Sequence, residues 1–150
     1  MNPISDSGSS TAKRAAAMLE ERNEGFIVPT ARQRQNMLVA FAKKGKVVYG
    51  KAFDIVRLSA HVNLDDLGDV ENNLDRILVF EIKSTRKDLP PDFSGYFFGL
   101  SAAEVLVAQS LKDHFKFIFV NVNTGWHIEM GLGDIFARAK GIYPTWSIMF

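Results

Sequence analysis

Apolar residues recur at helical spacing in the first third of the chain. This spacing predicts a helix over 11–24 that ends before Gly25, a residue suited to a left-handed cap. A capping box formed by Thr30 and Gln33 predicts a second helix over 30–43. The two segments therefore predict an N-terminal helical pair.

The pattern then changes to that of extended segments. β-branched and aromatic residues over 46–58 predict one or two strands. The near-continuous apolar run over 76–83 predicts a central strand that is covered on both faces. A second such run over 115–122 predicts another buried strand, followed by a turn into 126–130 and a short helix near 132–140.

Loops and one further helix separate these runs. Residues 59–75, rich in Asp and Asn, and residues 85–99, which contain two consecutive prolines, predict loops. A capping box formed by Ser101 and Glu104 predicts a helix over 101–112. The order of the elements indicates an α/β protein with a mixed β-sheet flanked by helices.

Length and composition limit the possible classes of protein. A chain of 150 residues with 47% hydrophobic and 23% charged residues suits one folded domain and is unlike a disordered protein. We expect a disordered tail over 1–10, because these residues are small and polar, and a single domain over 11–150. The chain carries neither a membrane-length apolar run nor a secretion signal, so we expect no membrane partner and a cytoplasmic location.

Charge and cysteine content exclude further classes of site. The chain has no cysteine, which excludes a thiol nucleophile and a thiolate zinc site. Its formal net charge of +1 gives no support for nucleic-acid binding from bulk charge. Any such function must therefore rest on a local arrangement of residues.

The sequence Glu81-Ile82-Lys83 ends the most apolar predicted strand. Alternation along a strand places Glu81 and Lys83 on one face and Ile82 on the other. Charged groups leave water only when they are paired or bound to a metal, so this pair needs a partner. The alternative interpretation is a surface salt bridge at the end of a strand.

Asp54 interrupts a second apolar extended segment. If the two strands pair, the carboxylates of Asp54 and Glu81 and the carbonyl of Ile82 form the kind of oxygen ligand set that Mg²⁺ prefers. Lys83 then faces the water and the phosphate. Two carboxylates and a lysine meet the chemical needs of phosphodiester hydrolysis, which are a Lewis acid, an activated water and a cation near the developing charge.

These residues resemble the restriction-endonuclease-like, PD-(D/E)xK nuclease superfamily, over roughly residues 46–123. The resemblance is carried by Asp54, the run Glu81-Ile82-Lys83-Ser84-Thr85, and the segments Phe97 to Leu100, Ser101 to Glu104 and Phe117 to Val122. The sequence departs from the family pattern at Phe53, where the pattern has proline.

The resemblance implies a restriction-endonuclease-like core and a metal-dependent nuclease that hydrolyses phosphodiester bonds of DNA, in restriction or repair. Asp54 and Glu81 become metal ligands together with the Ile82 carbonyl, and Lys83 orients or activates the attacking water. The implied cofactor is Mg²⁺, with Mn²⁺ as a substitute, and the implied assembly is a homodimer if both strands are cut. A further metal ligand is sought among Glu20, Glu21, Glu24 and Glu104.

Other residues suit contacts with DNA. The hydroxyl and cationic side chains that follow the motif match those used for phosphate contacts, and these are Ser84, Thr85, Arg86 and Lys87. Arg32 and Arg34 lie at the start of the second helix and suit the recognition helix of a helix-turn-helix motif. The alternative function is thus a non-catalytic DNA-binding protein, either through these helices or through an inactive nuclease fold.

Overall fold

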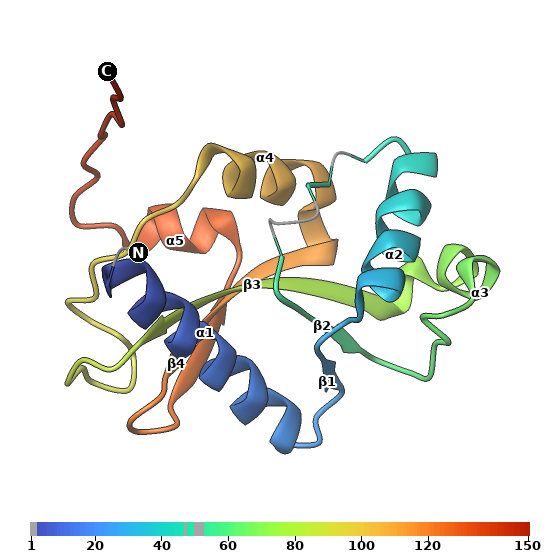
Figure 1. Ribbon diagram of the computed structural model, residues 1–150, viewed down its shortest axis with the longest axis horizontal. Coiled ribbons are helices and arrows are strands. Elements are labelled where there is room, and N and C mark those ends of the chain that lie inside the picture. The colour runs from blue at the N-terminus through green and yellow to red at the C-terminus, as the bar shows by residue number, and fades with distance from the viewer. Residues whose placement is uncertain (1–2, 47, 50–52) are drawn as a thin grey trace.

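The computed structural model describes residues 3–46, 48–49 and 53–150. Figure 1 shows a central sheet with helices on both of its faces. The strands are β1 (Phe26–Ile27), β2 (Ile55–Leu58), β3 (Ile77–Thr85), β4 (Phe115–Asn121) and β5 (His127–Met130). The α-helices are α1 (Pro3–Glu21), α2 (Ala31–Lys43), α3 (Leu67–Asn72), α4 (Ala102–Leu111) and α5 (Leu132–Arg138).

The sheet has five strands in the order β1-β2-β3-β4-β5. β3 and β4 are parallel, and the other neighbouring pairs are antiparallel. The crossover that a parallel pair requires runs through α4. The prediction of an α/β protein with a mixed sheet and two N-terminal helices is therefore confirmed.

Each face of the sheet carries its own apolar cluster. On one face Ala15 and Leu19 of α1 pack with Phe80 and Ile82 of β3. On the other face α2, α4 and α5 cover a larger cluster that includes Phe117 of β4. Because residues of a strand alternate between faces, Glu81 and Lys83 lie on the face with α2 and α4.

Local sequence signals account for the best-predicted elements. The capping boxes at Thr30 and Ser101 are both present, and they begin α2 and α4. β3 and β4 occupy the two apolar runs predicted as buried strands, and β5 and α5 follow where they were expected. The apolar content of β3 and β4 is needed because helices cover both faces of these strands.

Several predicted boundaries are wrong. α1 begins at Pro3, a residue favoured in the first turn of a helix, and therefore starts before the predicted residue 11. Residues 26–27, predicted as a link, pair with β2 as a short edge strand. Within the predicted loop 59–75, Asp66 caps the short helix α3 with its side chain.

Of the one or two strands predicted over 46–58, the described residues contain one, β2. Val48 and Tyr49 lie outside any strand, and residues 47 and 50–52 lie outside the described residues. The strand that the pattern over 46–58 predicted begins at Ile55.

The two N-terminal helices do not form a helix-turn-helix. α1 packs on one face of the sheet and α2 on the other, with β1 between them in the chain. A recognition helix in a helix-turn-helix packs directly on its partner helix. Arg32 and Arg34 therefore belong to a helix that covers the sheet.

The predicted loop 85–99 is irregular but anchored. β3 extends to Thr85, and residues 86–101 have neither helix nor strand. Rings of Phe93, Tyr96 and Phe98 lie 4.9–6.2 Å from the Phe119 ring of β4. The Tyr96 hydroxyl also donates to the Ser84 carbonyl at 3.0 Å, which fixes the segment beside the end of β3.

Among the helices of the described residues, none combines the length and the apolar character that crossing a membrane requires.

Candidate active site

Strand register brings Asp54 and Glu81 face to face. Ile55 is opposite Phe80 in the antiparallel β2–β3 pair, so the preceding residue, Asp54, is opposite Glu81. The Asp54 backbone N–H donates to the Phe80 carbonyl at 2.8 Å, and the Asp54 carboxylate accepts from the Ile82 N–H at 2.8 Å. Asp54 is therefore held against β3 by its backbone and by its side chain.

Glu81 is a largely buried carboxyl group, with its side chain 14% exposed, and it lies among other carboxyl groups. Burial is the largest of the causes that together raise the pKa of Glu81 to about 10, and the charges of Asp54 and Glu104 and hydrogen bonds with both of them are the others. Its Oε2 atom is buried and has no hydrogen-bond donor as a partner. Since the neighbouring oxygens are themselves acceptors, Oε2 is satisfied only when it carries a proton or contacts a cation.

Lys83 is held by Glu104 of α4. The Lys83 Nζ lies 2.7 Å from Glu104 Oε2 and 3.1 Å from Oε1, and 3.9 Å from Glu81 Oε1. Glu104 also accepts from the Ser101 N–H at 2.7 Å as part of the capping box. Burial alone would raise the pKa of Glu104, but the hydrogen bonds from Lys83 and Ser101 outweigh burial and lower it.

Glu104 thus has the capping role that the sequence predicted, and a second role that it did not. One buried carboxylate joins the start of α4 to the lysine of β3. The missed signal is its place in the fold. Glu104 is the third residue of α4, the helix of the crossover that follows β3, and it contacts Lys83 of that strand.

Arg34 of α2 closes another side of the site. Its Nη1 donates to the Phe53 carbonyl at 2.5 Å, and its guanidinium carbon lies 4.5 Å from the centre of the Phe53 ring. Burial lowers the pKa of Arg34, while the charges of Asp54 and Glu81 oppose this shift. Arg34 therefore fixes the residue before Asp54 and places a positive charge near both carboxyl groups.

The arrangement suits a divalent cation held by few side chains. N–H and C=O groups of one strand residue point to the same side, so the Ile82 carbonyl faces the side on which its N–H meets Asp54. Asp54, Glu81 and this carbonyl are oxygen donors, and the unpartnered Glu81 Oε2 is the atom that a cation would satisfy. Among the described residues no group of three His, Asp or Glu side chains is placed to hold a metal ion. The third nearby carboxylate, Glu104, is paired with Lys83.

The glutamates of the first helix lie away from this site. α1 covers the opposite face of the sheet, and the Glu20 carboxylate accepts from the Val28 N–H at 2.8 Å. Glu21 and Glu24 are exposed at and beyond the end of α1. The sheet itself therefore separates these three residues from Glu81.

The residues predicted to contact DNA differ in position. Thr85 is buried, and its hydroxyl accepts from the Lys87 N–H at 3.1 Å. Arg86 and Lys87 are exposed just after β3, and Ser84 is half-buried. Arg32 is exposed on α2, whereas Arg34 points into the site.

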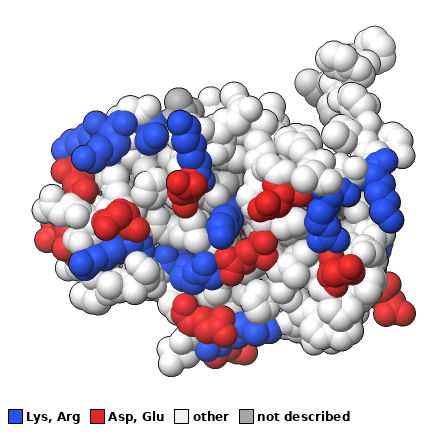
Figure 2. Space-filling model, turned by 180° about the vertical axis from the view of Figure 1, so that it is seen from behind, with Lys and Arg blue, Asp and Glu red and all other residues white. Residues whose placement is uncertain are grey.

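The surface charge is mixed on the face opposite to the view in Figure 1. Figure 2 shows basic residues gathered toward the α2 and α3 end of this face and acidic residues interleaved with basic ones elsewhere. This mixed surface agrees with a net charge of +1. Support for a phosphate substrate therefore comes from the residues of the local site and not from the surface charge.

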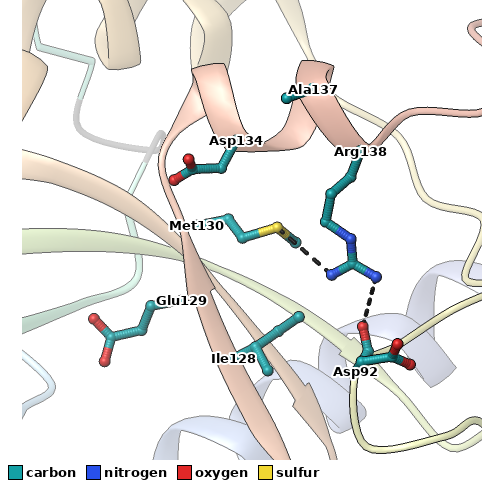
Figure 3. Close-up of a pocket in the computed structure, with 7 residues that line it drawn as sticks. All are labelled: Asp92, Ile128, Glu129, Met130, Asp134, Ala137 and Arg138. Atoms are coloured by element: carbon teal, nitrogen blue, oxygen red, sulfur yellow. Dashed lines mark hydrogen bonds between the residues drawn. The ribbon is translucent and has the colours of Figure 1, made fainter.

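A separate hollow of about 410 Å³ lies between β5, α5 and the loop at Asp92 (Figure 3). Its cation, Arg138, donates to the Asp92 carbonyl at 2.7 Å and contacts the Met130 sulfur at 3.8 Å. The guanidinium is therefore engaged in holding α5 to the loop.

Comparisons of the chain with protein-family models, curated proteins and solved structures found no match.

Proposed function

We propose that the protein is a Mg²⁺-dependent nuclease that hydrolyses phosphodiester bonds of DNA. The proposal rests on the Glu81 carboxyl group, which lies opposite Asp54 with its Oε2 atom buried and lacking a donor. Such a carboxyl group is costly to ionise without a cation, and carboxyl groups with strongly shifted pKa values cluster at functional sites.

Each residue of the site has a distinct role in this proposal. Asp54, Glu81 and the Ile82 carbonyl hold the cation, and when bound the cation lowers the pKa of water and withdraws charge from the phosphate. Lys83 supplies a positive charge and proton donors beside Glu81. Arg34 holds the Phe53–Asp54 segment against the sheet, so that the carboxylate stays opposite Glu81.

Lys83 also fits the role of orienting the attacking water. Its ammonium group donates to both oxygens of Glu104, which fixes the position of Nζ. An ammonium group has three protons, so one remains for a water or a phosphate oxygen. Fixed hydrogen-bond donors of this kind are the main source of transition-state stabilisation in such reactions.

The test is cleavage of supercoiled plasmid and linear duplex by the full chain in Mg²⁺, Mn²⁺ or chelator. We expect cleavage with either metal, none with chelator, and none with Glu81→Gln. Glu21→Gln is the matched control, because this exposed carboxylate lies on the α1 side of the sheet. Cleavage that persists in chelator or in Glu81→Gln contradicts the proposal, and salt-sensitive DNA binding without cutting favours a non-catalytic DNA-binding protein.

A further inference from the structure

Residues 139–150, here called the apolar arm, project from the body of the protein after α5 (Figure 1). Every residue of the arm is exposed, and its only charged residue is Lys140. The large apolar side chains of the arm are each at least 65% exposed, and these are Ile142, Tyr143, Trp146, Ile148, Met149 and Phe150. Large apolar side chains exposed together in one segment of a folded protein mark an interaction site.

The body carries exposed apolar residues where the arm leaves it. Phe97 in the loop before α4, Leu106 on α4 and Phe136 on α5 are each at least 48% exposed, and we call these three residues the apolar patch. α4 and α5 pack against each other, and the Phe97 ring lies 6.3 Å from the Tyr143 ring at the base of the arm. Figure 2 shows the arm extending away from the body, beside a broad uncharged area.

We propose that two copies of the chain form a symmetric dimer in which each arm lies on the apolar patch of the other copy. One chain carries both halves of this contact, so a twofold axis generates two identical contacts and closes the assembly. The partner is thus a second copy, and the inference does not depend on the proposed nuclease activity.

The area available matches that of a stable interface. A large aromatic side chain buries about 150–250 Å² and aliphatic ones somewhat less, so the six side chains of one arm offer on the order of 1,000 Å². Stable interfaces bury about 1,200–2,000 Å² in total, counted over both partners. The two arms together offer about 2,000 Å², of which the part that meets the three side chains of each apolar patch is buried. An arm of 12 extended residues also spans roughly 40 Å, which is enough to cross from one body to another.

Sedimentation equilibrium of the full chain over a range of concentrations tests the dimer. We expect the wild-type chain to be dimeric, and the arm variant with Trp146→Ser and Phe150→Ser to raise the dimer dissociation constant at least about 30-fold. The patch variant Phe136→Ser is expected to act in the same direction. Val28→Ser is the matched control, because Val28 is an exposed apolar residue outside the arm and the patch.

Mixing the two variants separates arm exchange from other modes of association. Each variant alone lacks one half of the contact, whereas a mixed pair regains one intact arm and one intact patch. We therefore expect the mixture to associate more tightly than either variant alone. A monomeric wild-type chain at all concentrations, or a dimer that neither variant weakens, overturns the proposal.

Circular dichroism distinguishes a lost contact from a lost fold. The substituted side chains are exposed and outside both apolar clusters, so each variant is expected to keep the wild-type helix and strand signal. Plasmid cleavage by the monomeric arm variant reports separately on the active site.

Discussion

Replacing Glu81 by Gln should stabilise the metal-free protein at neutral and alkaline pH. The pKa of Glu81 is about 10 in the folded protein, against an ordinary value of 4.5. Between these values the folded state binds one proton more than the unfolded state, so the free energy of unfolding falls as the pH rises. Glutamine has the same shape as the protonated acid and has no proton to lose.

The size of the effect follows from the shift. Each pH unit between 4.5 and 10 removes about 1.4 kcal/mol from the free energy of unfolding, so the Glu81 carboxyl costs about 4 kcal/mol between pH 5 and pH 8. In the Glu81→Gln variant this fall in the free energy of unfolding with rising pH is absent. Other ionisable groups contribute to both proteins, and the difference between the two pH profiles isolates Glu81.

The assay is urea unfolding in chelator at pH 5 and pH 8, with Glu21→Gln as control. We expect the stability difference between Glu81→Gln and wild type to grow with pH, and the control to follow wild type. Adding Mg²⁺ should stabilise wild type by about 2.7 kcal/mol at 100 times the dissociation constant, and the variant far less. Parallel pH profiles in chelator would refute the burial and charge argument for Glu81.

Three other substitutions test the neighbours of Glu81. Lys83→Gln should lower the cleavage rate by about 10²–10⁴-fold. It should also lower the free energy of unfolding by about 3 kcal/mol, because the buried Glu104 loses its cation. Plasmid nicking and urea unfolding measure the two effects, and a wild-type cleavage rate would exclude Lys83 from the reaction. Arg34→Lys keeps the charge but loses the planar contact with Phe53, so we expect the kcat of cleavage to fall about 10-fold or more. An unchanged kcat would contradict the positioning of Asp54 by this arginine. Ser101→Ala should cost about 1 kcal/mol in the free energy of unfolding and Ser101→Gly only a few tenths, and equal losses would argue against the side-chain cap.

Elements with strong local signals could be predicted from the sequence. β3 and β4 are long apolar runs, and α4 begins with a capping box. Both features depend on nearby residues alone. α3 and β1 were missed because they are six and two residues long, too short for a periodic pattern to appear. Their formation depends on a cap at Asp66 and on pairing with β2, which the chain acquires only on folding.

The candidate site was predictable to the same extent. Alternation along one strand placed Glu81 and Lys83 together, and pairing with a second strand placed Asp54 opposite Glu81. The roles of Glu104 and Arg34 depend on which helices cover that face, and short-range patterns do not encode this. For the same reason the sequence suggested a helix-turn-helix, whereas the first two helices cover opposite faces of the sheet.

The metal site is tested most directly by an anomalous difference map from a crystal of the full chain soaked in Mn²⁺. We expect a peak within bonding distance of the Asp54 and Glu81 carboxylates and the Ile82 carbonyl, beside Lys83, and no such peak in a Glu81→Gln crystal. A wild-type crystal with bound Mn²⁺ only elsewhere, or with none, would contradict the assignment of these residues as a metal site.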